Sequence, residues 1–307
     1  MSEVEIGGTE VRELDGYLVG PERVARNRAR TEQLQAAGTP VRDGGNIHDD
    51  ETAQKLGFRG GTVAGSIHLD QFPPVLTAAF GGQWFERGSV SLHFRNATVD
   101  AEAVIAMVGV PGPGATQVAA RMERADGMAV ADGTAGCVET EPPYLHAIDL
   151  RPSPPEELRL LAGVEAGQPL TERTFTVASA DQVARLEAAP ITEPLDLYTT
   201  SGRFGPPVVN PSQVVHVLRN GPHDFGAEVA QAVGLFGAIE IRFVDGPLLC
   251  DTPYRMSGEV AAVGASPKTE YVWYDSRATD EHGRVAATMR MQLRWMKASS
   301  PLYAGDG

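Results

Sequence analysis

The sequence predicts an α+β protein built from two similar halves, each with one long helix packed on an antiparallel sheet. Internal repetition is the first observation, because segment 88–110 resembles 237–260 and segment 57–72 matches 203–218 without a gap. The first pair alternates apolar and polar residues, which indicates strands with one buried face. In the second pair, apolar residues recur at steps of four and three after Gly65, which is typical of a helix lying on a sheet.

Each strand segment continues into a predicted hairpin with a charged tip. The first hairpin covers residues 116–138 and turns near the Asp-Gly pair at 126–127. The second covers residues 269–296 and turns near the His-Gly pair at 282–283. We therefore expect about four antiparallel strands per half, joined edge to edge into one sheet so that each half covers an exposed edge of the other.

Two further features concern the helices. Pro73 and Pro74 interrupt the long apolar stripe of the first half, so that helix should kink or restart there. Upstream, residues 17–26 resemble residues 175–185, and both segments predict the end of a strand followed by a helix. A proline-rich acidic stretch then suggests a boundary between domains 1–150 and 151–307.

The segment RDGGNIHDDETAQKLGFRGG, residues 42–61, occurs in the first half only. In the first half 32 residues separate Arg26 from Phe58, whereas only 19 separate Arg185 from Phe204 in the second. The polar segment falls within this excess. We therefore expect the first domain to carry the chemistry, in a deep pocket beside residues 43–66, and the second to supply walls and a shallower groove.

Composition narrows the classes of function. The 307-residue chain is 42% hydrophobic and 21% charged, with a net charge of −14 that argues against nucleic acid as a partner. No apolar run reaches the length of a membrane span, and the acidic N-terminus does not resemble a secretory signal. Cys137 and Cys250 are expected to be reduced thiols buried in strands, so we predict a cytoplasmic protein.

The order of elements resembles the hotdog fold, and the polar segment resembles the signature of MaoC-like, R-specific enoyl-CoA hydratases. Asp43 precedes His48 by five residues and Asp50 follows it by two, as in that signature. Phe58 begins the turn that follows, and TVAGS at 62–66 matches the opening of the family's helix. At the level of fold, the resemblance covers the whole chain as a fused tandem of two hotdog domains.

The resemblance implies a hydratase or dehydratase that acts on a 2-enoyl or 3-hydroxyacyl thioester. Such chemistry needs an acid–base pair around one water and hydrogen-bond donors for the thioester oxygen. The acyl group would be carried by coenzyme A or a carrier protein as part of the substrate. We expect no other cofactor and no metal, and a homodimer of such double domains is compatible with the fold. The expected site residues are Asp43 and His48 for catalysis, and Gly65, Ser66, Asn46 and Arg59 for binding of the thioester.

Alternative interpretations remain open. Gly45 and Asn46 stand where the family has Asn and Pro, which favours a non-catalytic acyl-thioester-binding or assembly module. A thioesterase is a further candidate, because hotdog folds also host that chemistry. Asp43 could instead fix a turn and Asn46 could fix the loop. The acidic residues after His48 also suit the first turn of a helix over 49–56.

Overall fold

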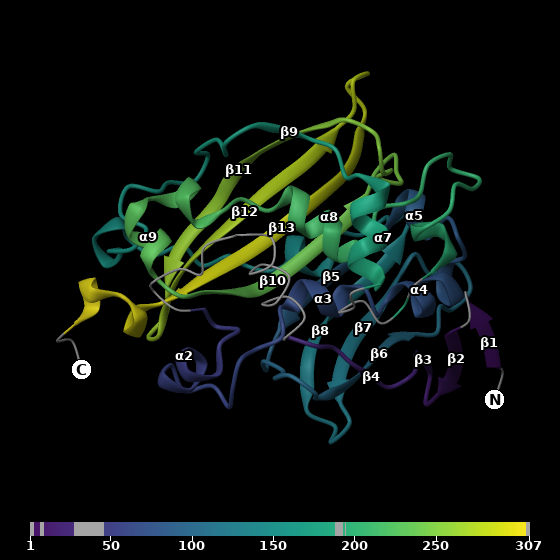
Figure 1. The fold of residues 1–307 in the computed structure, drawn as a ribbon, viewed down its shortest axis with the longest axis horizontal. Coiled ribbons are helices and arrows are strands. Elements are labelled where there is room, and N and C mark those ends of the chain that lie inside the picture. The colour runs from purple at the N-terminus through teal and green to yellow at the C-terminus, as the bar shows by residue number, and fades with distance from the viewer. Residues whose placement is uncertain (1–2, 7–8, 28–45, 188–192, 194, 305–307) are drawn as a thin grey trace.

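The computed structural model describes residues 3–6, 9–27, 46–187, 193 and 195–304, so Asp43 lies outside the described residues. Its strands form one 13-stranded sheet (Figure 1). Across this sheet the order is β1 (Glu3–Ile6), β2 (Thr9–Leu14), β3 (Tyr17–Val19), β6 (Ala103–Gly109), β7 (Gln117–Arg124), β8 (Ala129–Cys137), β5 (Gly88–Phe94), β10 (Gly234–Phe243), β13 (Val285–Met296), β12 (Thr269–Thr279), β11 (Tyr254–Ala265) and β9 (Arg173–Phe175), while β4 (Arg23–Val24) also pairs with β6.

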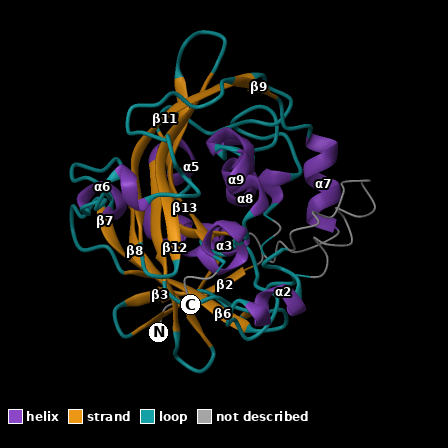
Figure 2. Cartoon of the chain, turned by 90° about the vertical axis from the view of Figure 1, so that its left-hand side faces the viewer, coloured by secondary structure: helices purple, strands orange, loops and turns teal. Residues whose placement is uncertain are grey.

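The helices lie on both faces of this sheet. They are α2 (Asp50–Lys55), α3 (Gly65–Leu69), α4 (Pro73–Phe80), α5 (Trp84–Arg87), α6 (Tyr144–Ala147), α7 (Ser179–Glu187), α8 (Pro211–Leu218) and α9 (Ala227–Gln231). Figure 2 shows α3, α7, α8 and α9 on one side of the sheet and α6 on the other. Among the described residues, no helix has the length and apolar character needed to cross a membrane.

The two halves join through antiparallel pairing of β5 with β10. Ser91 lies opposite Glu240, Ser89 lies opposite Arg242, and His93 lies opposite Ala238. In the sequence repeat Ser89 corresponds to Ala238 and His93 corresponds to Arg242. Exchanging the two halves therefore turns the Ser89–Arg242 pair into the His93–Ala238 pair, so the pairing is reciprocal. A pseudo-twofold axis therefore passes between Ser91 and Glu240. The expected joining of the halves edge to edge is confirmed.

The first long helix is interrupted as the prolines predict. α3 ends at Leu69, and α4 begins at Pro73, which occupies its first turn. Leu69, Phe72 and Leu76 have no exposed surface and form the apolar stripe against the sheet. The corresponding helix of the second half, α8, has no such interruption.

One predicted helix is absent from the described residues. In the first half, Arg23 and Val24 pair with Val104 and Ala103 as the short strand β4, where the repeat predicted a helix. The Gly20 N–H also donates to the carbonyl of Ala106 (3.0 Å). The backbone of this segment therefore forms its hydrogen bonds along the edge of β6. In the second half β9 is followed by α7, as predicted.

The linker between the halves is fastened to the joint rather than loose. In α6 the Leu145 N–H donates to Ser91 Oγ (2.9 Å), and Ser91 Oγ donates to Glu240 Oε2 (2.7 Å). His146 Nδ1 lies 2.8 Å from the other oxygen of the Glu240 carboxylate. The linker thus contacts both halves at the pseudo-twofold axis. The boundary at residue 150 stays a prediction.

Both cysteines are free and buried, as expected, but only Cys137 lies in a strand; Cys250 lies in the turn after β10. Burial raises the pKa of both thiols, that of Cys250 to about 11. We expect both to react slowly with a disulfide reagent at pH 8 in the folded chain and rapidly in urea, because thiolate is the reactive form. Rapid labelling of the folded chain would contradict this. The cytoplasmic location stays a prediction.

Candidate active site

The loop before α2 is held by its own polar side chains. The Asp49 carboxylate accepts the N–H of Thr52 (2.8 Å) and caps α2, and this hydrogen bond lowers the pKa of Asp49. Asn46 accepts two backbone N–H groups, through Oδ1 from His48 (3.1 Å) and through its carbonyl from Asp49 (2.8 Å). The structure therefore favours the loop-fixing interpretation of Asn46, and the acidic run forms the first turn of the helix.

His48 is half-buried, and its ring is oriented by the segment before α3. Its Nδ1 lies 2.5 Å from the carbonyl oxygen of Thr62. A carbonyl can only accept, so Nδ1 carries the proton in this pair. In neutral imidazole, Nε2 is then the basic nitrogen. The backbone carbonyl of His48 accepts a hydrogen bond from Asn27 Nδ2 (2.7 Å), which fixes the residue at its main chain as well.

Close contact between two loops sets this geometry. The Thr62 N–H donates to the carbonyl of Ile47 (2.9 Å), and the Gly61 N–H donates to Asp50 Oδ1 (2.7 Å). A Cβ atom on Gly61 would overlap the carbonyl oxygen of His48 and lie 2.8 Å from its carbonyl carbon. Glycine is therefore required at this position for the His48 loop to lie against the Thr62 segment.

The segment that holds His48 leads directly into α3. Ala64 is the N-cap residue and offers no side-chain hydrogen bond, and Gly65 and Ser66 form the first turn. A Cβ atom on Gly65 would lie 2.5 Å from the tip of the Phe94 ring. Gly65 was expected to leave room for the thioester, whereas its missing side chain here leaves room for Phe94. A ligand can reach Gly65 from this side only if that ring moves.

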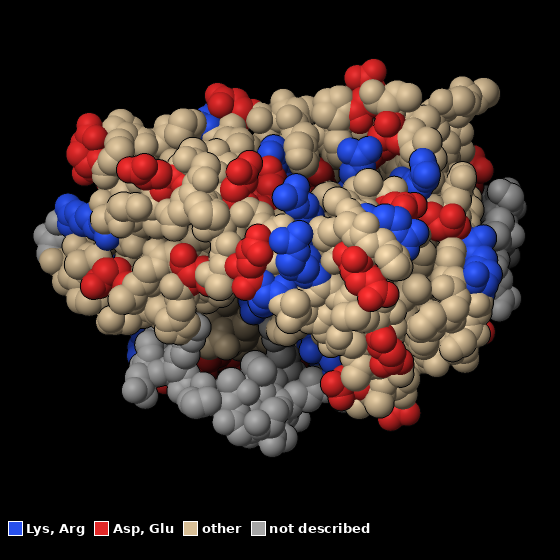
Figure 3. Space-filling view, turned by 90° about the horizontal axis from the view of Figure 1, so that it is seen from above, with Lys and Arg blue, Asp and Glu red and all other residues tan. Residues whose placement is uncertain are grey.

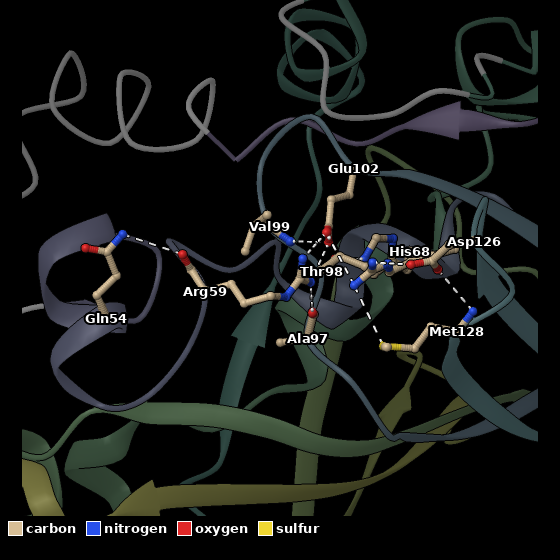
Figure 4. Close-up of polar contacts among 10 residues, drawn as sticks. Gln54, Arg59, His68, Ala97, Thr98, Val99, Glu102, Asp126 and Met128 are labelled. Atoms are coloured by element: carbon tan, nitrogen blue, oxygen red, sulfur yellow. Dashed lines mark hydrogen bonds and ion pairs between the residues drawn. The ribbon is translucent and has the colours of Figure 1, made fainter.

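Arg59 was expected to bind the thioester, but its guanidinium is held by a carboxylate (Figure 4). Both of its terminal nitrogens bond to Glu102, Nη2 at 2.9 Å, and Nη2 also donates to the carbonyl of Ala97 (3.2 Å). Glu102 also accepts the N–H of Val99 (2.9 Å) and lies 3.4 Å from Arg124. Arg59 therefore ties the loop after α2 to residues 97–102, a structural role that the sequence did not reveal.

His68 is packed in the interior on the α3 side of the same region (Figure 4). Its side chain is 2% exposed, and Nε2 lies 2.7 Å from Thr98 Oγ1. Burial lowers the pKa of His68 to about 4, so it is neutral at pH 7. The carbonyl of Thr98 accepts the N–H of Val63 (2.8 Å). His68 therefore packs behind the segment that contains Thr62 and has a structural role.

The start of α8 is the counterpart of the start of α3, and a carboxylate of the first half fills it. Asp70 Oδ1 accepts the N–H of Ser212 (2.8 Å) and Nδ2 of Asn210 (3.0 Å), and Asp70 has no exposed surface. Ser212 corresponds to Ser66 in the repeat. The helix start of the second half is therefore closed by the protein itself. Sequence reasoning missed Asp70, although a lone carboxylate within an apolar helix could have indicated it.

Asp70 should make stability depend on pH. Burial raises its pKa from 3.8 to about 6, although the hydrogen bonds from Ser212 and Asn210 oppose this. The folded chain holds this proton more tightly than the unfolded chain, so stability decreases as pH rises from about 4 to about 6, by roughly 3 kcal/mol. In urea titrations, the wild-type chain should lose stability relative to Asp70→Asn across this range.

Asp251→Asn is the matched control. A hydrogen bond from the Ser179 N–H lowers the pKa of Asp251, so its contribution is lost as pH falls and changes in the opposite sense to that of Asp70. A stability difference between wild type and Asp70→Asn that is constant with pH would contradict the prediction.

A groove of about 550 Å³ lies in the second half. One face of α7, the segment 199–207 and Asp251 line it. We expected a closed or shallower groove near 189–212; residues of this range line the groove beside α7, and the start of α8 is closed. The deep pocket expected beside residues 43–66 depends on Asp43 and its neighbours, which lie outside the described ranges, and stays a prediction.

Charge on the described surface is mixed in sign. Figure 3 shows acidic and basic side chains interspersed on one face, without a continuous basic surface. The net charge of −14 agrees with this distribution. A polyanion such as nucleic acid therefore finds no extended cationic surface on this face.

Comparison with solved structures confirms the fold. The chain is similar to a protein described as a MaoC domain dehydratase from Chloroflexus aurantiacus J-10-fl, with a TM-score of 0.58, 12% identity, and coverage of 95% of this chain and 96% of that one. It is also similar to a conserved hypothetical protein of Mycobacterium tuberculosis with a double hotdog fold, with a TM-score of 0.53, 13% identity, and coverage of 92% and 97%. No family model and no curated protein matches the sequence.

The chain is thus an α+β protein with the double hotdog fold. The suspected likeness to MaoC-like dehydratases is confirmed at the level of fold, because a structure described as a MaoC domain dehydratase matches this chain along nearly its whole length. At such identity the similarity concerns the fold alone, and the chemistry has to be argued from the residues of this chain.

Proposed function

We propose that this double hotdog protein is a hydratase or dehydratase that adds water to a 2-enoyl thioester or removes it from a 3-hydroxyacyl thioester. The orientation of His48 carries the proposal. Its Nδ1 donates to the carbonyl of Thr62 at 2.5 Å, two residues before the N-cap Ala64 of α3, so Nε2 is the basic nitrogen of the neutral ring. A fixed neutral imidazole of this kind suits a general base near pH 7.

In the hydration direction, Nε2 of His48 takes a proton from water as the water oxygen bonds to the β-carbon of the enoyl group. Electron density moves onto the thioester oxygen, and the α-carbon then receives a proton. We assign that proton donation to the Asp43 carboxyl group on the basis of the sequence motif, and the His48 imidazolium then returns its proton to the Asp43 carboxylate, which restores both groups. Backbone N–H groups of Gly65 and Ser66, at the uncapped start of α3, would stabilise the negative oxygen.

Coenzyme A and an acyl carrier protein are both candidates for the carrier of the acyl group. Asn46 and Arg59 are less suited to bind it than the sequence suggested, because each is engaged by the protein itself. We therefore restrict the proposed substrate contacts to the start of α3 and to the walls around His48.

The decisive experiment incubates the purified full-length chain with crotonyl-CoA and follows loss of the conjugated enoyl absorbance. Formation of 3-hydroxybutyryl-CoA would support the proposal. Release of free coenzyme A, detected with a thiol reagent, would point instead to a thioesterase. If butyryl-CoA binds but neither product is formed, the catalytic proposal is overturned.

A non-catalytic acyl-thioester-binding module is the second candidate, and Phe94 is the observation that favours it. Its ring covers Gly65, so an acyl thioester bound elsewhere around His48 would lack the N–H donors of the helix start that turnover needs. Binding of butyryl-CoA without turnover of any enoyl-CoA would support this second function.

A further inference from the structure

The second half extends its central strand toward the candidate site of the first. In the repeat, Gly237 corresponds to Gly88, where β5 begins. The strand β10 begins three residues before Gly237, at Gly234. In the first half, the residues before Gly88 form α5 instead, where Trp84 and Phe85 are buried in the core. The added piece, Gly234–Phe236, thus has no counterpart strand in the first half.

A β-bulge follows this extension. The pairing of β10 with β13 shifts between Phe236 and Ala238, so Gly237 is an extra residue in the ladder. A Cβ atom on Gly237 would overlap the side-chain amide of Gln292 and lie 2.5 Å from Arg294 Nε, so both of these side chains would have to shift to admit a larger residue. Bulges of this kind turn the neighbouring side chain away from the direction it would have in a regular strand.

The residues around the bulge flank the hydrogen bond that orients His48. The Phe236 ring packs against a buried cluster at the start of α3 that includes Val63 and Ala64. These residues directly follow Thr62, whose carbonyl accepts from His48. On the other side, Val233 packs against Ile47, the residue before His48. The second half therefore supplies apolar contacts to the chain neighbours of both partners of this hydrogen bond.

Phe236 is half-buried, and its ring also has a cationic neighbour. The Arg219 guanidinium lies over the ring, 5.8 Å from its centroid, which is within cation–π range. Arg173 Nη2 donates to the Arg219 carbonyl (2.6 Å) and fixes the main chain at this point. The ring thus lies between the Arg219 guanidinium and the apolar cluster at the start of α3.

We infer that Phe236 forms a wall of the acyl-binding site and limits the length of the acyl chain that the first-half site accepts. The inference rests on the proposed function, because it takes an acyl thioester as the ligand. An aromatic ring fixed from both sides resists displacement, so a longer chain would meet it rather than push it aside. Removing the ring would open space lined by the apolar residues at the start of α3.

The test compares Phe236→Ala with Phe204→Ala. Phe204 is a suitable control because it is also half-buried, lies in the second half and carries an arginine over its ring, with Arg203 4.3 Å from the centroid. For each protein, kcat/KM is measured with crotonyl-, hexenoyl-, octenoyl- and decenoyl-CoA. Dissociation constants are measured by calorimetry for the saturated butyryl-, octanoyl- and decanoyl-CoA.

We expect Phe236→Ala to increase the preference for octenoyl- over crotonyl-CoA by roughly tenfold or more, the usual discrimination of a hydrophobic pocket. Phe204→Ala should keep the wild-type preference. The dissociation constants of the saturated ligands should shift in the same direction as the kinetic preference. A Phe236→Ala profile identical to that of the wild type, in a variant with unchanged thermal unfolding, would overturn the inference.

The binding measurement separates this inference from the proposed function. If wild type binds saturated acyl-CoA without hydrating any enoyl-CoA, the hydratase proposal fails. In that case, a change in the acyl-chain length that Phe236→Ala binds best would still support the inference that Phe236 is a wall of the site. If wild type binds no acyl-CoA, the inference about Phe236 is overturned together with the proposed class of substrate. Phe236→Leu, which keeps an apolar side chain at the site, should give an intermediate shift and guards against misfolding of the alanine variant.

Discussion

His48→Ala should lower kcat/KM for hydration of crotonyl-CoA at least about a hundredfold, the usual size of a general acid–base contribution. The effect should fall on kcat, because the imidazole takes up a proton only as the reaction proceeds. Binding of butyryl-CoA should survive, since the walls around the site do not include the His48 ring. His282→Ala is the matched control, because that side chain is 71% exposed at a hairpin tip.

The partner carboxylate can be tested with the same assay. Asp43→Asn should lower turnover to a similar extent, and the double variant should be little worse than either single variant, because residues that act as a unit are not additive. Full activity of the His48 variant would place the chemistry elsewhere in the chain. An active enzyme that is indifferent to Asp43 would transfer the role of the carboxylate to Asp49 or Asp50.

Gly61→Ala should reduce kcat/KM nearly as much, although Gly61 takes no part in the chemistry. The added methyl group would overlap the His48 carbonyl, so the His48 loop and the Thr62 segment must separate. That movement weakens the hydrogen bond from His48 to the Thr62 carbonyl and displaces the imidazole. A displacement of about 1 Å at a catalytic group can cost roughly a hundredfold in rate.

Gly112→Ala is the control for this prediction, because no atom lies within 4 Å of the position that its Cβ would take. Activity and thermal unfolding should both be unchanged in that variant. For Gly61→Ala, a thermal unfolding scan shows whether the chain still folds at the assay temperature. A folded Gly61→Ala enzyme with wild-type kcat/KM would mean that the position of His48 does not control the reaction.

Local patterns in the sequence were sufficient for much of the fold. The alternation that ends in Phe94 and Phe243 identified both central strands, and the repeat correctly aligned the two halves across the β5–β10 joint. Pro73 located the interruption of the first long helix. These features follow from side-chain periodicity and from the geometry of proline, which act over a few residues and do not depend on the rest of the chain.

Local patterns failed where a free sheet edge or a distant partner decided the outcome. Residues 17–26 have the sequence of a strand followed by a helix, but Arg23 and Val24 instead pair with the edge of β6 as a strand. Cys250 lies in an apolar run but in a turn, because the chain leaves β10 before it. In the first of these cases tertiary pairing overrode a local preference that is worth little on its own.

The sequence by itself determined the double hotdog architecture and the candidate histidine, because repeats, periodicity and motif spacing are properties of the linear chain. The tertiary structure alone decided how the candidate site is arranged. It paired Arg59 with Glu102, placed Asp70 at the start of α8 and brought Phe236 against Ala64. These contacts join residues far apart in the chain, and the last two form only when the β5–β10 register brings the two halves together. No pattern of a few neighbouring residues can specify such a register.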